Sequence, residues 1–571
     1  MRSPAPRALL ATAAIAVALA AADTYVVVLA LTDMMAGVGV GIGALQQATP
    51  IISGFLLGYV AVLPLIGRIA DLTSRQKVLL WCLIVFVAGS ALTALAHDLP
   101  TLVAGRVVQG VGGGGLVPAT LAIVGELWPP DRRGVPLGIV GAVQEIGSVV
   151  GPLLGALVLA VADWRAIFWL NAVLGVLLAL MVLLLGRARS PETADPRQRN
   201  RPPYAAASRS RSVLRAGVWV LGAAITALAL AAPESLVTSV AYGGPFVPFE
   251  GASSRLLTPI GVTGLTLLAL ATALTAPALW PLLRQADLPG ALLLGGALGC
   301  IVVTFAAAEP EREVVGPLGY ALLPVAALLT AGFLWHQRRP AHPVVPRGPL
   351  PRRSVIALVV SLLVGVALVA GVVDVPVLAH LTHTDSQVGA AFVLVRFLIA
   401  VPVGAFLGGA ALRRCGDGLV TAVGLALAAA GLAIMATWGE GSLRSAASYV
   451  VLVAVGLGVG LALAPVNNTM LAETGRALHG TVSSLVVVAR MVGMVVGLAV
   501  LTGIGLHAYY REVEALPDRT DGDALLQAGL VQVHAVFIGA ALAAALGAAL
   551  AVALGVRRRT AAVAERIVTI G

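Results

Sequence analysis

Charged residues are scarce in this chain of 571 residues: Asp, Glu, Lys and Arg make up 11% of it, against 59% hydrophobic residues. That balance excludes an ordinary soluble globular protein. Cysteine is also rare, and Cys82, Cys300 and Cys415 are too widely spaced to indicate a disulfide framework or a metal site. The sequence has no phosphate-binding loop, which disfavours direct use of ATP, and its scattered histidines indicate no catalytic site.

Long apolar runs recur along nearly the whole chain. A membrane-spanning helix needs roughly 20 mostly apolar residues. We predict sixteen spans, at 8–31, 48–66, 78–96, 100–125, 135–160, 167–186, 214–232, 257–280, 290–307, 316–335, 354–378, 387–411, 418–437, 447–470, 480–506 and 531–556. The runs at 214–232 and 257–280 are the weakest, so fourteen spans are the alternative.

Lys and Arg gather in every second connecting segment, above all in 187–215 and 336–353. Because basic residues concentrate on the cytoplasmic side of a membrane, this pattern predicts a cytoplasmic membrane protein with both termini in the cytoplasm. We interpret the net charge of +10 as this topology signal. Contact with membrane lipids is therefore expected, and a nucleic-acid partner is not.

A few ionisable residues interrupt the apolar runs: Asp23, Glu145, Asp374 and Arg490. A charge at bilayer depth costs at least about 2.5–3.5 kcal/mol, so it usually faces a water-filled cavity and has a function there. Asp and Glu can bind a proton, whereas Arg cannot lose one. We predict a transporter in which protons bind Asp23 and Glu145, with Arg490 as their cationic partner. For Glu145 and Asp374 the alternative is a fixed buried pair.

The loop after the second span carries Gly67, Asp71 and Arg75 in the order G-x-x-x-D-x-x-S-R. This resembles the loop motif of the major facilitator superfamily, with Ser74 where the family usually has glycine. The resemblance implies a conformational latch, in which Asp71 and Arg75 pair at the cytoplasmic face and favour the outward-open state.

The fourth span begins with Gly105-Arg106-Val-Val-Gln109-Gly110, which resembles the fourth-helix motif of that superfamily and its buried arginine. The following Gly110-x-Gly112-x-x-Gly115 also fits a dinucleotide-binding fingerprint, but that motif requires a preceding strand. Inside a span, these glycines predict close helix packing instead.

The fifth span carries Gly147, Gly151, Pro152 and Gly155, similar to the antiporter motif of the superfamily. The resemblance implies a seam that restricts proton leak; simple helix packing is the alternative. The stretch 163–171 resembles the W-R-x-x-F-x-x-N signature of the drug:proton antiporter branch, which has extra central helices.

Within that branch the chain resembles the actinobacterial lipid exporters of the mycobacterial triacylglyceride type, over 23–28, 141–152, 396–418, 456–465 and 486–502. The resemblance implies an all-α integral membrane protein with two six-helix bundles and two to four extra central helices. It also implies a proton-coupled lipid exporter without a cofactor, which works with a periplasmic lipoprotein acceptor. A multidrug:proton antiporter, or a membrane receptor without transport, are the alternatives to lipid export.

The expected domains are an N-terminal bundle at 1–186, a basic linker at 187–213, central helices at 214–353, a C-terminal bundle at 354–560 and a tail at 561–571. Proline is absent from 481 to 515, a stretch that as one helix would reach about 50 Å, beyond a bilayer core of about 30 Å. We therefore predict an outward helical hairpin near 504–531; an ordinary loop is the alternative.

Overall fold

The computed structural model describes residues 5–40, 45–187, 209–239, 243–249, 254–306, 319–339, 351–383, 387–475, 478–517 and 521–555. Within these ranges the chain forms helices and turns without a β-strand. The predicted tail at 561–571 and most of the linker at 187–213 lie outside them.

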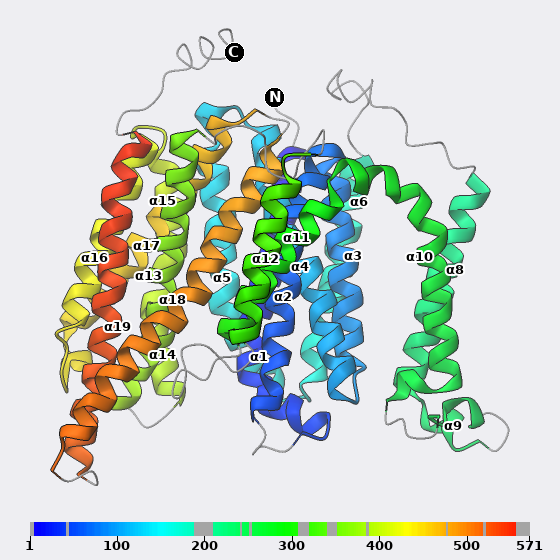
Figure 1. Cartoon of the computed structure of the whole chain (residues 1–571), viewed down its shortest axis with the longest axis horizontal. Helices are drawn as coiled ribbons and strands as arrows, with labels where there is room; N and C mark the ends of the chain where they lie inside the picture. The colour runs from blue at the N-terminus through cyan, green and yellow to red at the C-terminus, as the bar shows by residue number, and fades with distance from the viewer. Residues whose placement is uncertain are drawn as a thin grey trace.

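The helices stand roughly parallel, side by side (Figure 1). In chain order they cover Ala5–Gly37 (α1), Leu45–Leu72 (α2), Arg75–Ala94 (α3), Leu99–Leu127 (α4), Gly134–Leu159 (α5), Arg165–Arg187 (α6), Arg209–Ala231 (α8), Glu234–Val237 (α9), Pro259–Gln285 (α10), Leu288–Ala306 (α11), Gly319–His336 (α12), Arg352–Thr382 (α13), Gln387–Leu398 (α14), Ala400–Ala411 (α15), Asp417–Met435 (α16), Ala446–Glu473 (α17), His479–Ala515 (α18) and Gly522–Ala551 (α19). Every predicted span falls on a helix. In the described ranges fifteen helices are long and apolar enough to cross a membrane, and α11 contributes a shorter apolar stretch.

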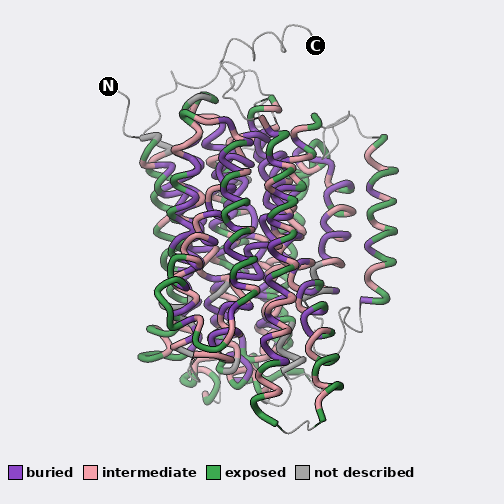
Figure 2. Tube along the Cα trace, turned by 90° about the vertical axis from the view of Figure 1, so that its left-hand side faces the viewer, coloured by how far each residue is buried: buried purple, intermediate pink, exposed green. Residues whose placement is uncertain are grey.

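Two bundles form the body, as predicted: α1–α6, and α13–α19 (Figure 1). Buried residues concentrate in the interior of the body, and exposed ones on its periphery (Figure 2). In α4 83% of the apolar span is buried, against 11% in α10, so α4 lies at the centre of its bundle and α10 at the edge of the molecule.

The extra central helices form two pairs. In one pair, α11 packs against α2 and α18, one helix from each bundle, and α12 packs against α11. The α8–α10 pair stands at the edge of the molecule (Figure 1). The segment directly before α10 attaches this pair to the turn between α3 and α4. There Ser254 donates to Asp98 over 2.8 Å, and Arg255 Nη1 lies 2.9 Å from His97 Nε2.

This attachment is expected to weaken in acid. Burial, and then the Arg255 guanidinium, hold the pKa of His97 below its ordinary value. The contribution of neutral His97 to stability is therefore complete above the pKa of about 6.5 that it has in the unfolded chain. It is lost as the pH falls through the lower pKa of the folded state, where His97 becomes protonated. The protection of the amides at 255–257 against hydrogen exchange, measured relative to the intrinsic exchange rate at each pH, should fall between pH 7.5 and pH 5. The same fall in His97→Gln, which cannot titrate, would contradict this explanation.

The predicted span at 387–411 is divided into α14 and α15. Pro402 lies in the first turn of α15. Because a proline ring clashes with the carbonyl group four residues earlier, a continuous helix would be disrupted at Leu398, where α14 ends.

Glycines bring the helices of the N-terminal bundle close together. A side chain at Gly110 or Gly114 would collide with the α2 backbone, and one at Gly112 with the α3 backbone. The packing interpretation of this glycine run is therefore correct.

The helices α18 and α19 extend beyond the body on the side opposite to where α1 begins and α19 ends (Figure 1). With 37 residues, α18 is about 55 Å long, well beyond the bilayer core of about 30 Å. Two contacts brace α19 against the segment that connects α16 and α17: Gln527 donates to Glu440 over 2.8 Å, and His534 Nε2 lies 2.6 Å from Trp438 O. The structure thus has two long packed helices where the proline-free stretch predicts a hairpin.

Candidate functional site

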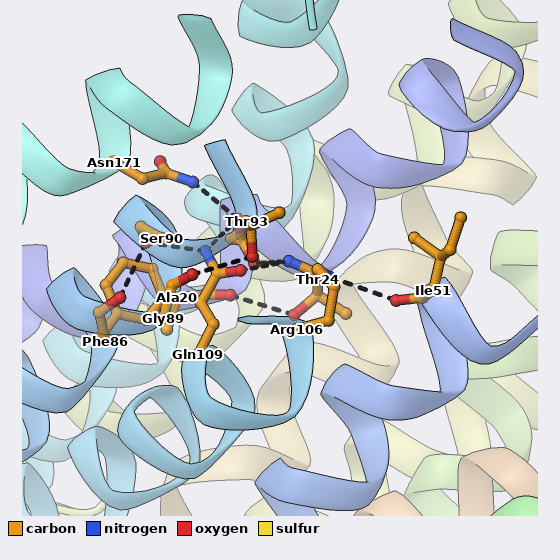
Figure 3. A network of polar contacts seen from close by, with 11 residues as sticks. Ala20, Thr24, Ile51, Phe86, Gly89, Ser90, Thr93, Arg106, Gln109 and Asn171 are labelled. Carbon is orange, nitrogen blue, oxygen red and sulfur yellow. Dashed lines mark hydrogen bonds and ion pairs between the residues drawn. The ribbon is translucent and has the colours of Figure 1, made fainter. Parts of the chain in front are cut away.

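A buried polar cluster fills the centre of the N-terminal bundle (Figure 3). Asp23 of α1 accepts a charge-assisted hydrogen bond from Arg106 Nη1 of α4 over 2.7 Å. Its other oxygen accepts from Gln109 Nε2 over 2.8 Å and from Asn171 Nδ2 of α6 over 2.6 Å. Both charged side chains are almost completely inaccessible, at 0% for Asp23 and 1% for Arg106. Three helices therefore meet at one carboxylate.

The sequence motifs explain how these groups converge. Arg106 and Gln109 are three residues apart and share a face of α4, so both reach Asp23. In α6, Phe168 and Asn171 have the same spacing; Asn171 binds Asp23, while the Arg106 guanidinium carbon lies 5.7 Å from the Phe168 ring centroid. The Phe55 ring of α2 also lies against that guanidinium, with its centroid 4.5 Å from the guanidinium carbon. Aromatic rings thus exclude water from the ion pair.

The second buried pair joins the two bundles. Arg490 Nη1 of α18 lies 4.0 Å from Glu145 Oε1 of α5, and both side chains are less than one-tenth exposed. A small pocket of about 20 Å³ adjoins Arg490, with Gln144, Asn467 and apolar side chains in its walls. Each of the two predicted carboxylates therefore has its own arginine. The prediction that Arg490 is the cationic partner of both carboxylates is wrong for Asp23, because Asp23 forms its ion pair with Arg106 of the same bundle.

Asp374 takes part in neither pair. It is buried on α13, and its Oδ2 atom has no hydrogen-bond partner. The sequence predicts that this residue either faces a cavity or belongs to a fixed buried pair; the structure places it in the C-terminal bundle without an ion pair among the described residues.

A second group of contacts closes the body on the side where α1 begins. Asp71, at the end of α2, accepts from the backbone of Gly480 over 2.7 Å and from the backbone and hydroxyl of Thr481 over 2.9 and 2.7 Å. These donors form the first turn of α18, where free N–H groups favour a negative charge. Asp71 therefore links the two bundles.

Arg75 has a partner that the motif does not imply. Its Nη1 atom forms an ion pair of 2.7 Å with Glu126 at the end of α4, within the same bundle. Its charge also acts favourably on Asp71, as the latch motif implies. The hydrogen bonds across the two bundles are made by Asp71, while the ion pair of Arg75 holds α3 to α4.

Arg133 forms a further link that sequence analysis missed. Its guanidinium donates to Gly125 O over 3.0 Å in its own bundle and to Leu471 O of α17 over 3.4 Å in the other. Next to it, the backbones of Gly134 and Gly409 touch, which brings α5 and α15 together. The signal available in the sequence is the pair of arginines, Arg132 and Arg133, directly before the fifth span.

Gly67 allows α2 to approach α18. An added Cβ there would lie 2.5 Å from Ser484 Oγ and 2.7 Å from Gly480 O. Gly67→Val is therefore expected to separate the bundles on this side and to increase labelling of a cysteine introduced at Ser483 at least several-fold. Gly217→Val is the matched control, since Gly217 lies in a helix with no neighbour within 4 Å. Equal labelling in both variants would contradict the latch.

The predicted antiporter motif forms the contact between α5 and α1. Side chains at Gly147 and Gly151 would collide with the carbonyl oxygens of Ala18 and Ala22, and one at Gly155 with Val26. The side chain of Pro152 lies outside the described part of the structure. The glycine face thus packs directly beside Asp23. Among the described residues no three His, Cys, Asp or Glu side chains are placed to hold a metal ion.

Comparison with known proteins agrees with this architecture. The family model for the Major Facilitator Superfamily matches residues 13–334. A triacylglyceride transporter of Mycolicibacterium hassiacum is 34% identical, with 86% of this chain and 79% of the relative covered. A triacylglyceride transporter of Mycobacterium tuberculosis is 32% identical over 85% of this chain and 80% of the relative.

Solved structures show the same fold. A human organic anion transporter is similar with a TM-score of 0.54 at 14% identity, covering 96% of this chain and 100% of the other. A proton:xylose symporter gives a TM-score of 0.54 at 14% identity, with coverage of 99% and 100%.

Proposed function

The chain belongs to the major facilitator superfamily and is a membrane transporter rather than an enzyme; on this basis we propose that it exports lipids or lipophilic compounds in exchange for protons. The observation that carries the proposal is the buried Glu145–Arg490 pair, which joins the two bundles beside a small pocket. A carboxylate in that position couples protonation to the relative position of the bundles.

The conformation supports alternating access. The contacts of Asp71, Arg133 and Gly67 close the body on the side where α1 begins, which we propose is the cytoplasm. A proton that reaches Glu145 from the outer side neutralises the carboxylate and weakens its attraction to Arg490. The bundles then separate on the cytoplasmic side, where the proton leaves and cargo enters. The membrane potential contributes about 2.3 kcal/mol per charge per 100 mV to this inward movement of protons.

Asp23 is the second proposed proton site. Its pair with Arg106 lies within one bundle, so protonation there does not break a cross-bundle contact directly. Instead it would release Arg106 and Asn171 and change the packing of α1 against α4 and α6. Since α1 packs on α5 through the glycine face, Asp23 is mechanically connected to Glu145.

The cargo assignment rests on the relatives and on the walls of the path. Both mycobacterial relatives are triacylglyceride transporters. The pocket beside Arg490 is lined mostly by apolar side chains, and about 20 Å³ has room for little more than water. A lipid would therefore enter only after the bundles have moved. Lipid analysis of the membranes and outer envelope of a strain lacking the protein tests the assignment; unchanged lipids with increased drug sensitivity would favour a multidrug antiporter.

The hairpin distinguishes lipid export from drug export. We propose that α18 and α19 carry lipid beyond the membrane to a periplasmic lipoprotein acceptor. Deletion of 507–530 should then reduce lipid export at least tenfold while a small lipophilic dye is extruded normally, because only an insoluble lipid needs a path through water. Equal loss of lipid export and dye extrusion would show that the hairpin is not specific to lipid export. Normal lipid export after the deletion would show that the hairpin is not needed for it.

A further inference from the structure

An apolar groove lies on the periphery of the C-terminal bundle, away from the central path. It has a volume of about 380 Å³ and is lined by Leu427 of α16 and by Tyr449, Val450, Val453, Ala454 and Leu457 of α17. Val450 is 69% exposed and Tyr449 48% exposed, so the groove opens outward. In a membrane protein such a surface faces the hydrocarbon of the bilayer.

A cation lies at one end of this groove. The guanidinium carbon of Arg396, on α14, lies 3.7 Å from the centroid of the Tyr449 ring. The Nη1 atom of Arg396 is buried and has no hydrogen-bond partner, and no carboxylate pairs with this side chain among the described residues. An arginine without an anion is expensive in an apolar environment. The side chain therefore has an unfilled capacity for an anionic oxygen.

The level of this cation in the membrane fits a lipid headgroup. Tyr449 is the fourth residue of α17, so it lies about 5 Å from the beginning of that helix. Tyrosine is enriched at the membrane–water boundary, and arginine side chains extend toward it. From Tyr449 to Leu457 the groove follows α17 for about 12 Å toward the centre of the bilayer. That distance is most of the roughly 15 Å of hydrocarbon in one leaflet.

We propose that this groove binds one anionic phospholipid of the leaflet opposite the termini, with its phosphate on Arg396 and an acyl chain along α17. A guanidinium recognises phosphate through parallel hydrogen bonds, and the Arg396 side chain is only partly buried, so it can still present donors to a phosphate. The apolar walls accept a chain and offer no polar partner to anything else. The site goes beyond the proposed export function, because its ligand belongs to the surrounding membrane and is not the cargo.

The proposal can be tested by native mass spectrometry of the full-length protein in detergent with added dioleoylphosphatidylglycerol. The wild type should retain one phosphatidylglycerol, and Arg396→Gln should lower its occupancy at least tenfold. Arg396→Lys, which keeps the charge, should lower it only a few-fold. Val453→Trp, which fills the groove without touching the cation, should also prevent binding. Arg444→Gln is the matched control, since Arg444 is an exposed arginine close to the beginning of α17.

Two results would overturn the site. If Arg396→Gln retains as much phosphatidylglycerol as the wild type, Arg396 does not bind the headgroup. Equal retention of dioleoylglycerol, which has the same chains but no phosphate, would show that the groove selects cargo-like neutral lipid instead. Because the readout is binding to purified protein, failure of the export proposal leaves these outcomes unaffected.

Discussion

Replacing Arg490 with alanine is expected to reduce proton-coupled export to the level of membranes without the protein. The substitution leaves Glu145 buried between the bundles without its cation, and removing one partner of a buried ion pair costs about 3–5 kcal/mol. Protonation of Glu145 can then no longer change a cross-bundle attraction. Proton uptake by proteoliposomes, driven by an imposed cargo gradient, measures the loss directly.

The control for this experiment is Arg444→Ala, which removes an exposed arginine at the outer end of the same bundle. It should transport at wild-type rates. Near-normal coupled transport by Arg490→Ala, in protein that is inserted to the same level, would refute the proposed coupling. Loss of insertion is separated from loss of coupling by measuring the folded fraction in the same membranes.

Asp23→Asn is expected to abolish export and also to destabilise the protein. The substitution leaves the Arg106 guanidinium, 1% exposed, without a counter-charge among Gln109, Asn171 and two aromatic rings. Such an unpaired buried charge costs about 3–5 kcal/mol. Thermal unfolding in detergent should therefore occur several degrees below the wild type, with transport at background.

A second substitution separates the two effects. Asp23→Asn combined with Arg106→Gln removes both charges, so thermal stability should recover at least in part while export stays at background. Recovery of export along with stability would show that this pair has only a structural role and that Asp23 does not bind the transported proton.

Much of the fold could be predicted from the sequence, because membrane spans depend on local composition. About 20 apolar residues in a row are sufficient to define a span, and every predicted span is helical in the structure, with the span at 387–411 divided into α14 and α15. The division at Leu398 was also predictable in principle, because the effect of Pro402 acts over a single turn. It was missed because the hydrophobic run continues across it.

The sequence by itself determined which residues are unusual: acids and arginines inside apolar helices, and glycines at helical spacing. Only the tertiary structure decided how they combine. Asp23 and Arg106 are 83 positions apart, and Arg133 and Leu471 are 338 positions apart. Whether such residues meet depends on the rotation and vertical register of packed helices, which arise from contacts along their whole length. Local pattern therefore identifies the ionisable groups, while packing between helices selects their partners.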